Sequence, residues 1–77
     1  MKVSIKDLFI TDKFADIVVT EDTKKVNLHV VFRPDNDIDF YEGEVHSHRS
    51  LDRDIFDNTT WWEIYNWVDR NVEALQW

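Results

Sequence analysis

The C-terminal part of the chain carries an apolar stripe at helical spacing, and this pattern constrains the fold more than any other. Its members recur three or four positions apart: Trp61, Ile64, Tyr65, Val68, Val72 and Leu75. Such spacing places them along one face of an α-helix. Thr60-Trp61-Trp62-Glu63 has the form of a capping box, which predicts that the helix begins there. A helix with one apolar face must bury it against a second layer, which the rest of the chain has to supply.

The preceding residues predict that the second layer is a β-sheet. Segments rich in β-forming or alternating apolar residues occupy 14–20, 26–32 and 37–45. In the second segment one face collects Val26, Leu28, Val30 and Phe32. Polar turns separate the segments at 21–24 and at 33–36, where Pro34 favours a type I turn. Because the connections are short, we expect a three-stranded antiparallel meander.

Two other segments carry weaker patterns. Ser4-Ile5-Lys6-Asp7 matches a capping box in outline and predicts one or two helical turns near the N-terminus, although the alternation of Val3 and Ile5 leaves a short strand open. Leu51 and Ile55, four residues apart, predict a single helical turn within the charged connection 47–57. The only glycine, Gly43, lies inside the third expected strand and predicts a bulge that lets Val45 face inward.

Together these patterns predict an α+β fold: a three-stranded antiparallel β-meander covered by one long C-terminal helix, with a short N-terminal helix as one alternative. The 77 residues allow a single domain, 1–77, and the absence of cysteine leaves its small core without a disulfide. No apolar run reaches the roughly 18–20 residues of a membrane span, and Met1-Lys2-Val3-Ser4 does not lead into a signal-peptide pattern. We therefore expect a cytoplasmic protein.

Charge is distributed unevenly along the chain. The formal net charge is −7, yet residues 1–34 hold six bases and five acids, for a net charge of +1. Residues 35–77 hold eleven acids and three bases, for a net charge of −8, and no lysine follows Lys25. Such a field repels nucleic acid and anionic membranes and attracts basic proteins. The alternative is that the charge only keeps a small aromatic-rich protein in solution.

Acids at alternate positions define the centre of the expected partner-binding surface. Asp35, Asp37 and Asp39 alternate, and Glu42 and Glu44 follow across the expected bulge. Residues two apart on an extended strand lie roughly 6.6 Å apart, and successive phosphates of a nucleic-acid strand have a similar spacing of about 6–7 Å. The outward face of this strand could therefore imitate a run of phosphates for a partner that grips nucleic acid with Lys and Arg. The alternative is an edge strand charged to prevent edge-to-edge aggregation.

Further residues extend this surface on either side of the helix start. The additional acids are Asp52, Asp54 and Asp57. Tyr41 and Trp62 would supply apolar anchors, because exposed aromatic residues are enriched at protein interfaces. Trp62 lies about 100° from Trp61 around the helix, on its polar side. The alternative for Trp62 is packing against neighbouring side chains or the sheet edge.

Asp35-Asn36-Asp37-Ile38-Asp39 is similar to the opening of an EF-hand loop, with acids at positions one, three and five. The rest of the loop departs from that pattern. Phe40 stands where the loop needs glycine, and His46 stands where it needs a bidentate glutamate. The flanking segments also predict strands instead of helices. We therefore expect no calcium site here.

His46-Ser47-His48 places two imidazoles on one face of a strand, where an acid such as Asp52 could complete a metal site. It also resembles the first half of the His-x-His-x-Asp-His motif of metallo-β-lactamase-fold hydrolases. Ser50 and Leu51 occupy the Asp and final His positions of that motif, and the chain is far too short for that fold. We expect these to be surface histidines and His29 to be structural or exposed, with no metal and no cofactor.

Signatures of other enzymes are absent from the sequence. There is no glycine-rich phosphate loop, no Gly-x-Ser-x-Gly elbow and no cysteine nucleophile. A three-stranded domain of this size also offers little volume for a pocket that buries a substrate. We therefore expect a protein that is not an enzyme.

The sequence favours a small acidic binding protein that blocks the basic surface of a nucleic-acid-handling partner by steric and electrostatic competition. In size, acidity and expected build it is similar in character to phage-encoded inhibitors of host defence, such as anti-CRISPR and anti-restriction proteins, and to acidic immunity proteins. This likeness is one of class and rests on no shared motif. One alternative is a structural or assembly subunit, such as a homodimer, that self-associates through a sheet edge and exposed aromatic residues. Another is a minimal metal-dependent enzyme centred on His46 and His48.

Overall fold

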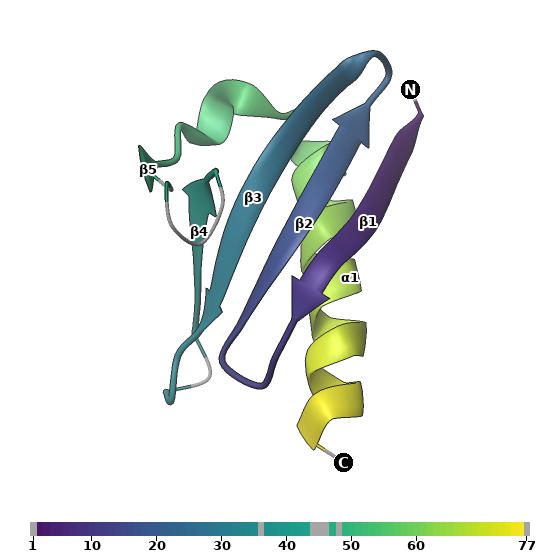
Figure 1. Cartoon of the computed structure of the whole chain (residues 1–77). Coiled ribbons are helices and arrows are strands. Elements are labelled where there is room, and N and C mark those ends of the chain that lie inside the picture. The colour runs from purple at the N-terminus through teal and green to yellow at the C-terminus, as the bar shows by residue number, and fades with distance from the viewer. Residues whose placement is uncertain (1, 36, 44–46, 48, 77) are drawn as a thin grey trace.

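A computed structural model describes residues 2–35, 37–43, 47 and 49–76, with the side chains of the C-terminal helix described as far as Asn71. The elements in chain order are β1 (Val3–Ile10), β2 (Phe14–Glu21), β3 (Lys24–Phe32), β4 (Ile38–Glu42), β5 (Arg49–Ser50), the 3₁₀ turn η1 (Arg53–Ile55) and α1 (Asn58–Gln76). The strands form one antiparallel sheet in the order β1-β2-β3-β4-β5, and α1 crosses one face of it (Figure 1). The α+β class is confirmed. The predicted number of strands is wrong, because the sheet has five.

The central hairpin of β2 and β3 forms where the sequence alternates most clearly. A two-residue turn, Asp22-Thr23, joins the strands, and Asp22 has a φ of 56°. Asp tolerates this left-handed conformation better than most residues, as such tight hairpin turns require. The resulting register pairs Ile17 with Leu28 and places both side chains on the face that α1 covers.

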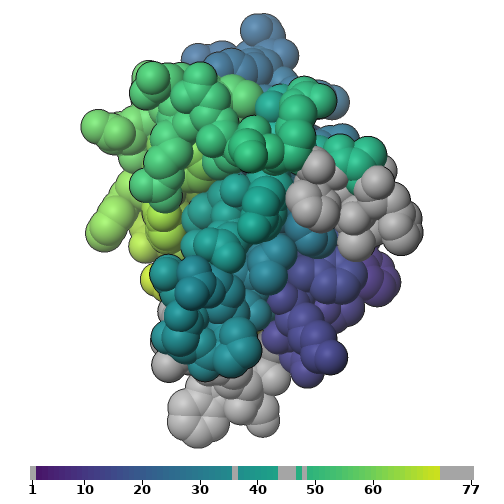
Figure 2. Space-filling view, turned by 90° about the vertical axis from the view of Figure 1, so that its left-hand side faces the viewer, coloured from purple at the N-terminus to yellow at the C-terminus, as the bar shows by residue number. Residues whose placement is uncertain are grey.

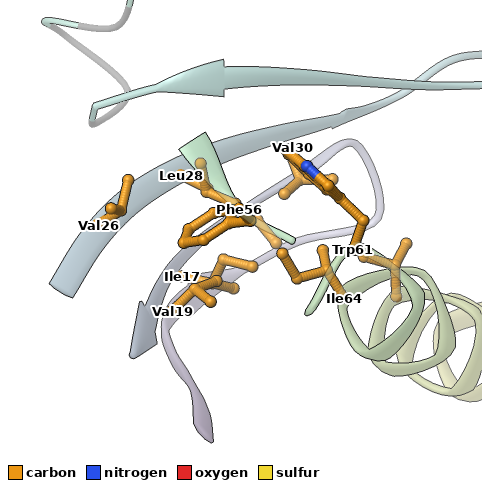
Figure 3. Packing of buried hydrophobic residues seen from close by; sticks show 10 residues of the cluster. Ile17, Val19, Val26, Leu28, Val30, Phe56, Trp61 and Ile64 are labelled. Atoms are coloured by element: carbon orange, nitrogen blue, oxygen red, sulfur yellow. The ribbon is translucent and has the colours of Figure 1, made fainter. Parts of the chain in front are cut away.

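The hydrophobic core lies between this hairpin and α1. Its fully buried apolar side chains are Ala15, Ile17, Val19, Leu28, Val30, Ile64 and Val68. Figure 3 shows Ile64 and Trp61 of the helix facing the strand side chains, with the Phe56 ring within the cluster. The helical stripe predicted from the sequence is therefore confirmed at Trp61, Ile64 and Val68, which are buried, and at Tyr65, which packs against them.

Phe56 and Trp61 fix the entry into α1. Their rings meet edge to face with centroids 5.4 Å apart, a favourable arrangement for aromatic pairs. The Trp61 indole Nε1 donates to the Arg53 carbonyl at 2.8 Å, so the buried indole keeps a hydrogen bond. This contact ties η1 to the first turns of the helix.

The N-terminal segment is a strand, so the predicted N-terminal helix is wrong and the alternative of a strand is confirmed. β1 pairs along its length with β2, and Ile5 and Ile10 pack against the core. The register shifts between Asp7 and Phe9, which marks a β-bulge. Pairing with a formed neighbour outweighs the local signal of Ser4-Ile5-Lys6-Asp7, because propensity yields to tertiary context.

The third predicted strand, 37–45, is shorter in the structure. β4 spans Ile38–Glu42, and Gly43 follows in a bend with a φ of 120°, which only glycine adopts readily. Its backbone N–H donates to the Asn27 carbonyl at 2.8 Å. β4 therefore ends at Glu42, directly before Gly43. The predicted inward position of Val45 lies outside the described residues.

The start of α1 differs from the capping-box prediction. The helix begins at Asn58, and the Asp57 carbonyl accepts the first intrahelical hydrogen bond, from the Trp61 N–H at 3.0 Å. Thr60 is fully buried within the helix and donates its hydroxyl to Glu21 on β2. The sequence placed Thr60 at the helix boundary because it could not show that a carboxylate on a strand would take its hydroxyl.

The short turn before α1 agrees in outline with the sequence. Leu51 and Ile55 are partly buried against the core, and the turn between them is the 3₁₀ helix η1. Among the described residues, no helix combines the length and the apolar character that crossing a membrane requires.

Replacing Ile64 tests the position of the core. Ile64→Ala should lower the free energy of unfolding by about 2–5 kcal/mol, because it removes a fully buried side chain and leaves a cavity. Urea unfolding followed by tryptophan fluorescence measures the change. Glu63→Ala, at the neighbouring exposed position, is the control and should cost less than about 0.5 kcal/mol. Equal losses in the two variants would contradict this arrangement of the core.

Candidate functional site

The acids singled out from the sequence gather on the side of the molecule formed by β4, β5 and η1. Two groups can be distinguished. The turn acids are Asp35, Asp37 and Asp39, at the β3–β4 turn and the start of β4. The η1 acids are Asp52, Asp54 and Asp57, around η1 and before α1. Figure 2 looks onto this side, with residues 33–39 in its lower part and residues 51–57 in its upper part.

The turn acids converge on one guanidinium group. Arg33 lies 2.9 Å from Asp35, 3.6 Å from Asp37 and 3.6 Å from Asp39, measured between nitrogen and carboxylate oxygen. All four side chains are at least 40% exposed, so water screens these ion pairs. Arg33 therefore neutralises part of the charge of the turn acids and holds them close together.

The turn acids do not form the extended ladder that the sequence predicted. β4 begins at Ile38, so Asp39 alone among them lies on a strand. The Asp35 carboxylate accepts from the Asp37 N–H at 3.1 Å, and the Asp37 carboxylate accepts from the Ile38 N–H at 2.9 Å. Asp and Asn stabilise turns through such local bonds. These acids make a compact cluster, not a row with the spacing of phosphates.

The other predicted residues of β4 lie on opposite faces of the sheet. Tyr41 pairs with His29 on the face away from α1 and is partly buried. Glu42 pairs with Leu28 on the opposite face, and its carboxylate lies 3.3 Å from the Arg49 Nε. The structure therefore does not bring Tyr41 and Glu42 into one surface. Glu44 lies outside the described residues.

The η1 acids are exposed, and one of them has a structural role. The Asp52 carboxylate caps η1 by accepting from the Asp54 N–H at 3.0 Å. The Arg53 guanidinium is directed elsewhere, because it lies over the Trp61 ring at 5.5 Å and hydrogen-bonds the Tyr65 hydroxyl. The Lys24 ammonium also reaches η1, where it donates to the Ile55 carbonyl. Within the described residues, the structure shows no ion pair at the η1 acids. Their charge is therefore available to a partner.

Trp62 supplies an exposed aromatic surface directly after the η1 acids. It is 66% exposed, although Trp61 beside it is 7% exposed. The predicted separation of these two residues around the helix is confirmed, and Trp62 is not packed against the sheet edge. An exposed indole next to carboxylates is typical of interface residues.

Sequence reasoning missed one polar site, a buried Asp–His pair on the sheet face away from α1. Asp16 is 7% exposed and His29 is 5% exposed, and the His29 Nδ1 lies 2.9 Å from the Asp16 Oδ1. The His29 ring packs between Phe14 and Tyr41, with centroids 5.2 and 6.4 Å away. The signal was present, because a turn at Asp22-Thr23 places positions 16 and 29 opposite each other. An imidazole oriented by a carboxylate can act as a base, but this burial fits a structural pair.

The metal hypotheses find no support in the described part of the chain. The fragment similar to an EF-hand lies at the β3–β4 turn and the start of β4. The Arg33 guanidinium lies among its three carboxylates, where a calcium ion would have to bind. His46 and His48 lie outside the described residues. Among the residues that the structure describes, no group of three or more His, Cys, Asp or Glu side chains could hold a metal ion.

Comparison with known proteins gives no assignment. No family model, no curated protein and no solved structure matches the chain.

A double-mutant cycle tests the buried pair. Asp16→Ala and His29→Ala should each lower the free energy of unfolding by about 1–3 kcal/mol, because each leaves a buried polar partner behind. The two losses should be non-additive by about 0.5 kcal/mol or more, since the side chains interact directly. Thermal or urea unfolding measures the cycle, and Asp12→Ala, at an exposed position, serves as the control. Additive losses would mean that the two residues contribute independently.

Proposed function

We propose that this protein is a small, non-enzymatic binding protein that uses its acidic side to occupy the basic surface of a nucleic-acid-handling protein. The partner would be displaced from nucleic acid by direct competition. In this respect the chain would act as anti-restriction and anti-CRISPR inhibitors do. The acidic side is defined here as the turn acids, the η1 acids and Trp62.

One observation carries this proposal: two groups of exposed carboxylates lie on the side of the molecule formed by β4, β5 and η1, and an exposed indole follows them in the first turn of α1. The longest extent of the molecule is 33 Å, so this side can span about one helical turn of duplex DNA, which is about 34 Å long. Charged groups arranged in this way steer a basic partner and raise its association rate. The apolar Trp62 would add a desolvated contact that charge alone does not provide.

The Arg33 contacts show what kind of side chain the turn acids accommodate. The Asp35 carboxylate lies 2.9 Å from a guanidinium nitrogen, which is the length of a charge-assisted hydrogen bond. The other two carboxylates lie 3.6 Å away, within the distance of an ion pair. Partner arginines make the same kind of contact with phosphate. The turn acids would therefore add to the binding surface, and the η1 acids, with no ion pair among the described residues, would contribute more of its charge.

A competition experiment tests the function. The protein is used as bait in an extract of its native host at about 0.1 M and about 0.5 M salt, because the Debye length falls from about 10 Å to about 4–5 Å over that range. We expect to recover a basic nucleic-acid-binding protein that is released at high salt. Added to that purified partner, the chain should displace a labelled DNA or RNA fragment. A partner that binds the chain and the fragment simultaneously would contradict the proposed competition.

Charge-neutralising variants test the site on the same partner. The variant Asp52→Asn/Asp54→Asn/Asp57→Asn should lower the association rate at about 0.1 M salt by about tenfold, because electrostatic steering depends on these charges. The variant Asp35→Asn/Asp37→Asn/Asp39→Asn should have a smaller effect, because Arg33 already neutralises part of that charge. The matched control is Asp7→Asn/Asp12→Asn/Asp22→Asn, which removes the same charge from exposed positions elsewhere. Equal rates for all three folded variants would remove these residues from the site.

A further inference from the structure

The sheet has two edges, and they differ greatly in length. β1 lies at one end of the strand order and spans Val3–Ile10, whereas β5 at the other end spans only Arg49–Ser50. Figure 1 shows β1 as the outermost strand on the right, with α1 behind the sheet. Within the described residues, no strand pairs with the outer side of β1. An unpaired strand of this length is a template for adding another strand.

The backbone of β1 presents a regular set of hydrogen-bonding groups at this edge. The Lys2 carbonyl accepts from the Asp22 N–H, which places Lys2 opposite Asp22 in a hydrogen-bonded pair. Hydrogen-bonded and non-hydrogen-bonded pairs alternate along an antiparallel ladder. The N–H and C=O groups of Ser4 and Lys6 therefore point toward β2, and those of Val3, Ile5 and Asp7 point outward. The bulge after Asp7 ends this regular stretch.

Exposed apolar side chains lie at the end of the same stretch. Leu8 is 52% exposed and Phe9 is 55% exposed. Apart from Trp62, these are the large hydrophobic side chains that the described structure leaves exposed. Two of the three such residues are thus adjacent on one edge strand, directly after the regular stretch that ends at Asp7.

The charge distribution favours a second copy of the chain as the added strand. Residues 1–34, which form β1, β2 and β3, have a net charge of +1, whereas residues 35–77 have a net charge of −8. A dimer joined at β1 would bring the nearly neutral strands together and keep the turn acids and the η1 acids, beside β4 and β5, at its two far ends. Pairing through β5 would bring the acidic ends together over two residues only.

We infer that two copies of the chain associate through antiparallel pairing of β1 with β1, with Ile5 on the two-fold axis. In this register Val3, Ile5 and Asp7 of one copy exchange backbone hydrogen bonds with Asp7, Ile5 and Val3 of the other. Ser4 of each copy lies directly opposite Lys6 of the other. Centring the pair on Lys6 or on Asp7 would instead oppose like charges, which is unfavourable in a sheet. The result is one continuous sheet with the acidic side of each copy at its outer ends.

A charge swap at Ser4 tests this register. Ser4 is exposed, so its replacement leaves the fold intact. Ser4→Glu should tighten the dimer and Ser4→Lys should weaken it, because the new charge in each copy lies opposite Lys6 of the other copy. This pair occurs twice in each dimer. Cross-strand charge pairs are strong enough that we expect a change in the dimer Kd of about two- to thirtyfold in each direction. Sedimentation velocity from about 1 μM to about 1 mM, a range that covers weak association, measures the Kd.

The matched controls are Ser50→Glu and Ser50→Lys, which place the same charges on the opposite edge strand. These variants report the effect of the change in net charge alone. In Ser50→Glu the added negative charge opposes dimerisation, because the chain is already acidic. A wild-type protein that stays monomeric to about 1 mM, or Ser4 variants that follow the Ser50 variants, would overturn the proposal. This test involves no partner protein, so its result is independent of the function proposed above.

Amide hydrogen exchange of the wild-type chain supplies a second readout. Raising the protein concentration should slow exchange at Val3, Ile5 and Asp7, whose N–H groups point outward in the monomer. Exchange at Ser4 and Lys6 should change less, because their N–H groups already bond to β2. Protection of another edge, or uniform protection along β1, would contradict the proposed pairing.

Discussion

The contact between the β2–β3 hairpin and one face of α1 is the interaction on which the rest of the structure depends. Alternate side chains of the hairpin, such as Ile17 and Leu28, are fully buried only because Ile64 and Val68 cover them. The chain has no disulfide, and in the part that the structure describes this one small core supplies the apolar burial. β1 and β4 extend this sheet on either side and so position the two surfaces for which we propose functions.

The sequence predicted those parts of the fold in which the hydrophobic pattern of one strand or one helix shows which face is buried. The alternation in β3 and the helical stripe of α1 report directly which face is buried. The first is confirmed, and the second is confirmed as far as Val68, the last member of the stripe whose side chain is described. Boundaries that depend on a second element were predicted less well. β1 is a strand because β2 pairs with it, and Thr60 lies inside the helix, where it reaches a carboxylate on β2. Neither contact is encoded within a short window of sequence.

For the acidic surface, the sequence predicted which residues carry the charge but did not predict which side chains they contact. Charge counting identified the acids and the excess in the second half of the chain. It could not show that Arg33 reaches three of them or that Arg53 is held over Trp61 and Tyr65, away from the η1 acids. The buried pair of Asp16 and His29 was equally hidden, because each residue alone looks like an ordinary polar position on the solvent face of a strand.

The order of the strands also bears on how the chain folds. Every strand pairs with its neighbour in sequence, so the sheet grows by successive hairpins whose short loops cost little closure entropy. Among the described residues, contacts between α1 and β1 join the first and the last element of the chain. If the sheet forms hairpin by hairpin, its apolar face stays in contact with water until the helix docks. A chain with a formed sheet and an undocked helix would therefore be prone to aggregation.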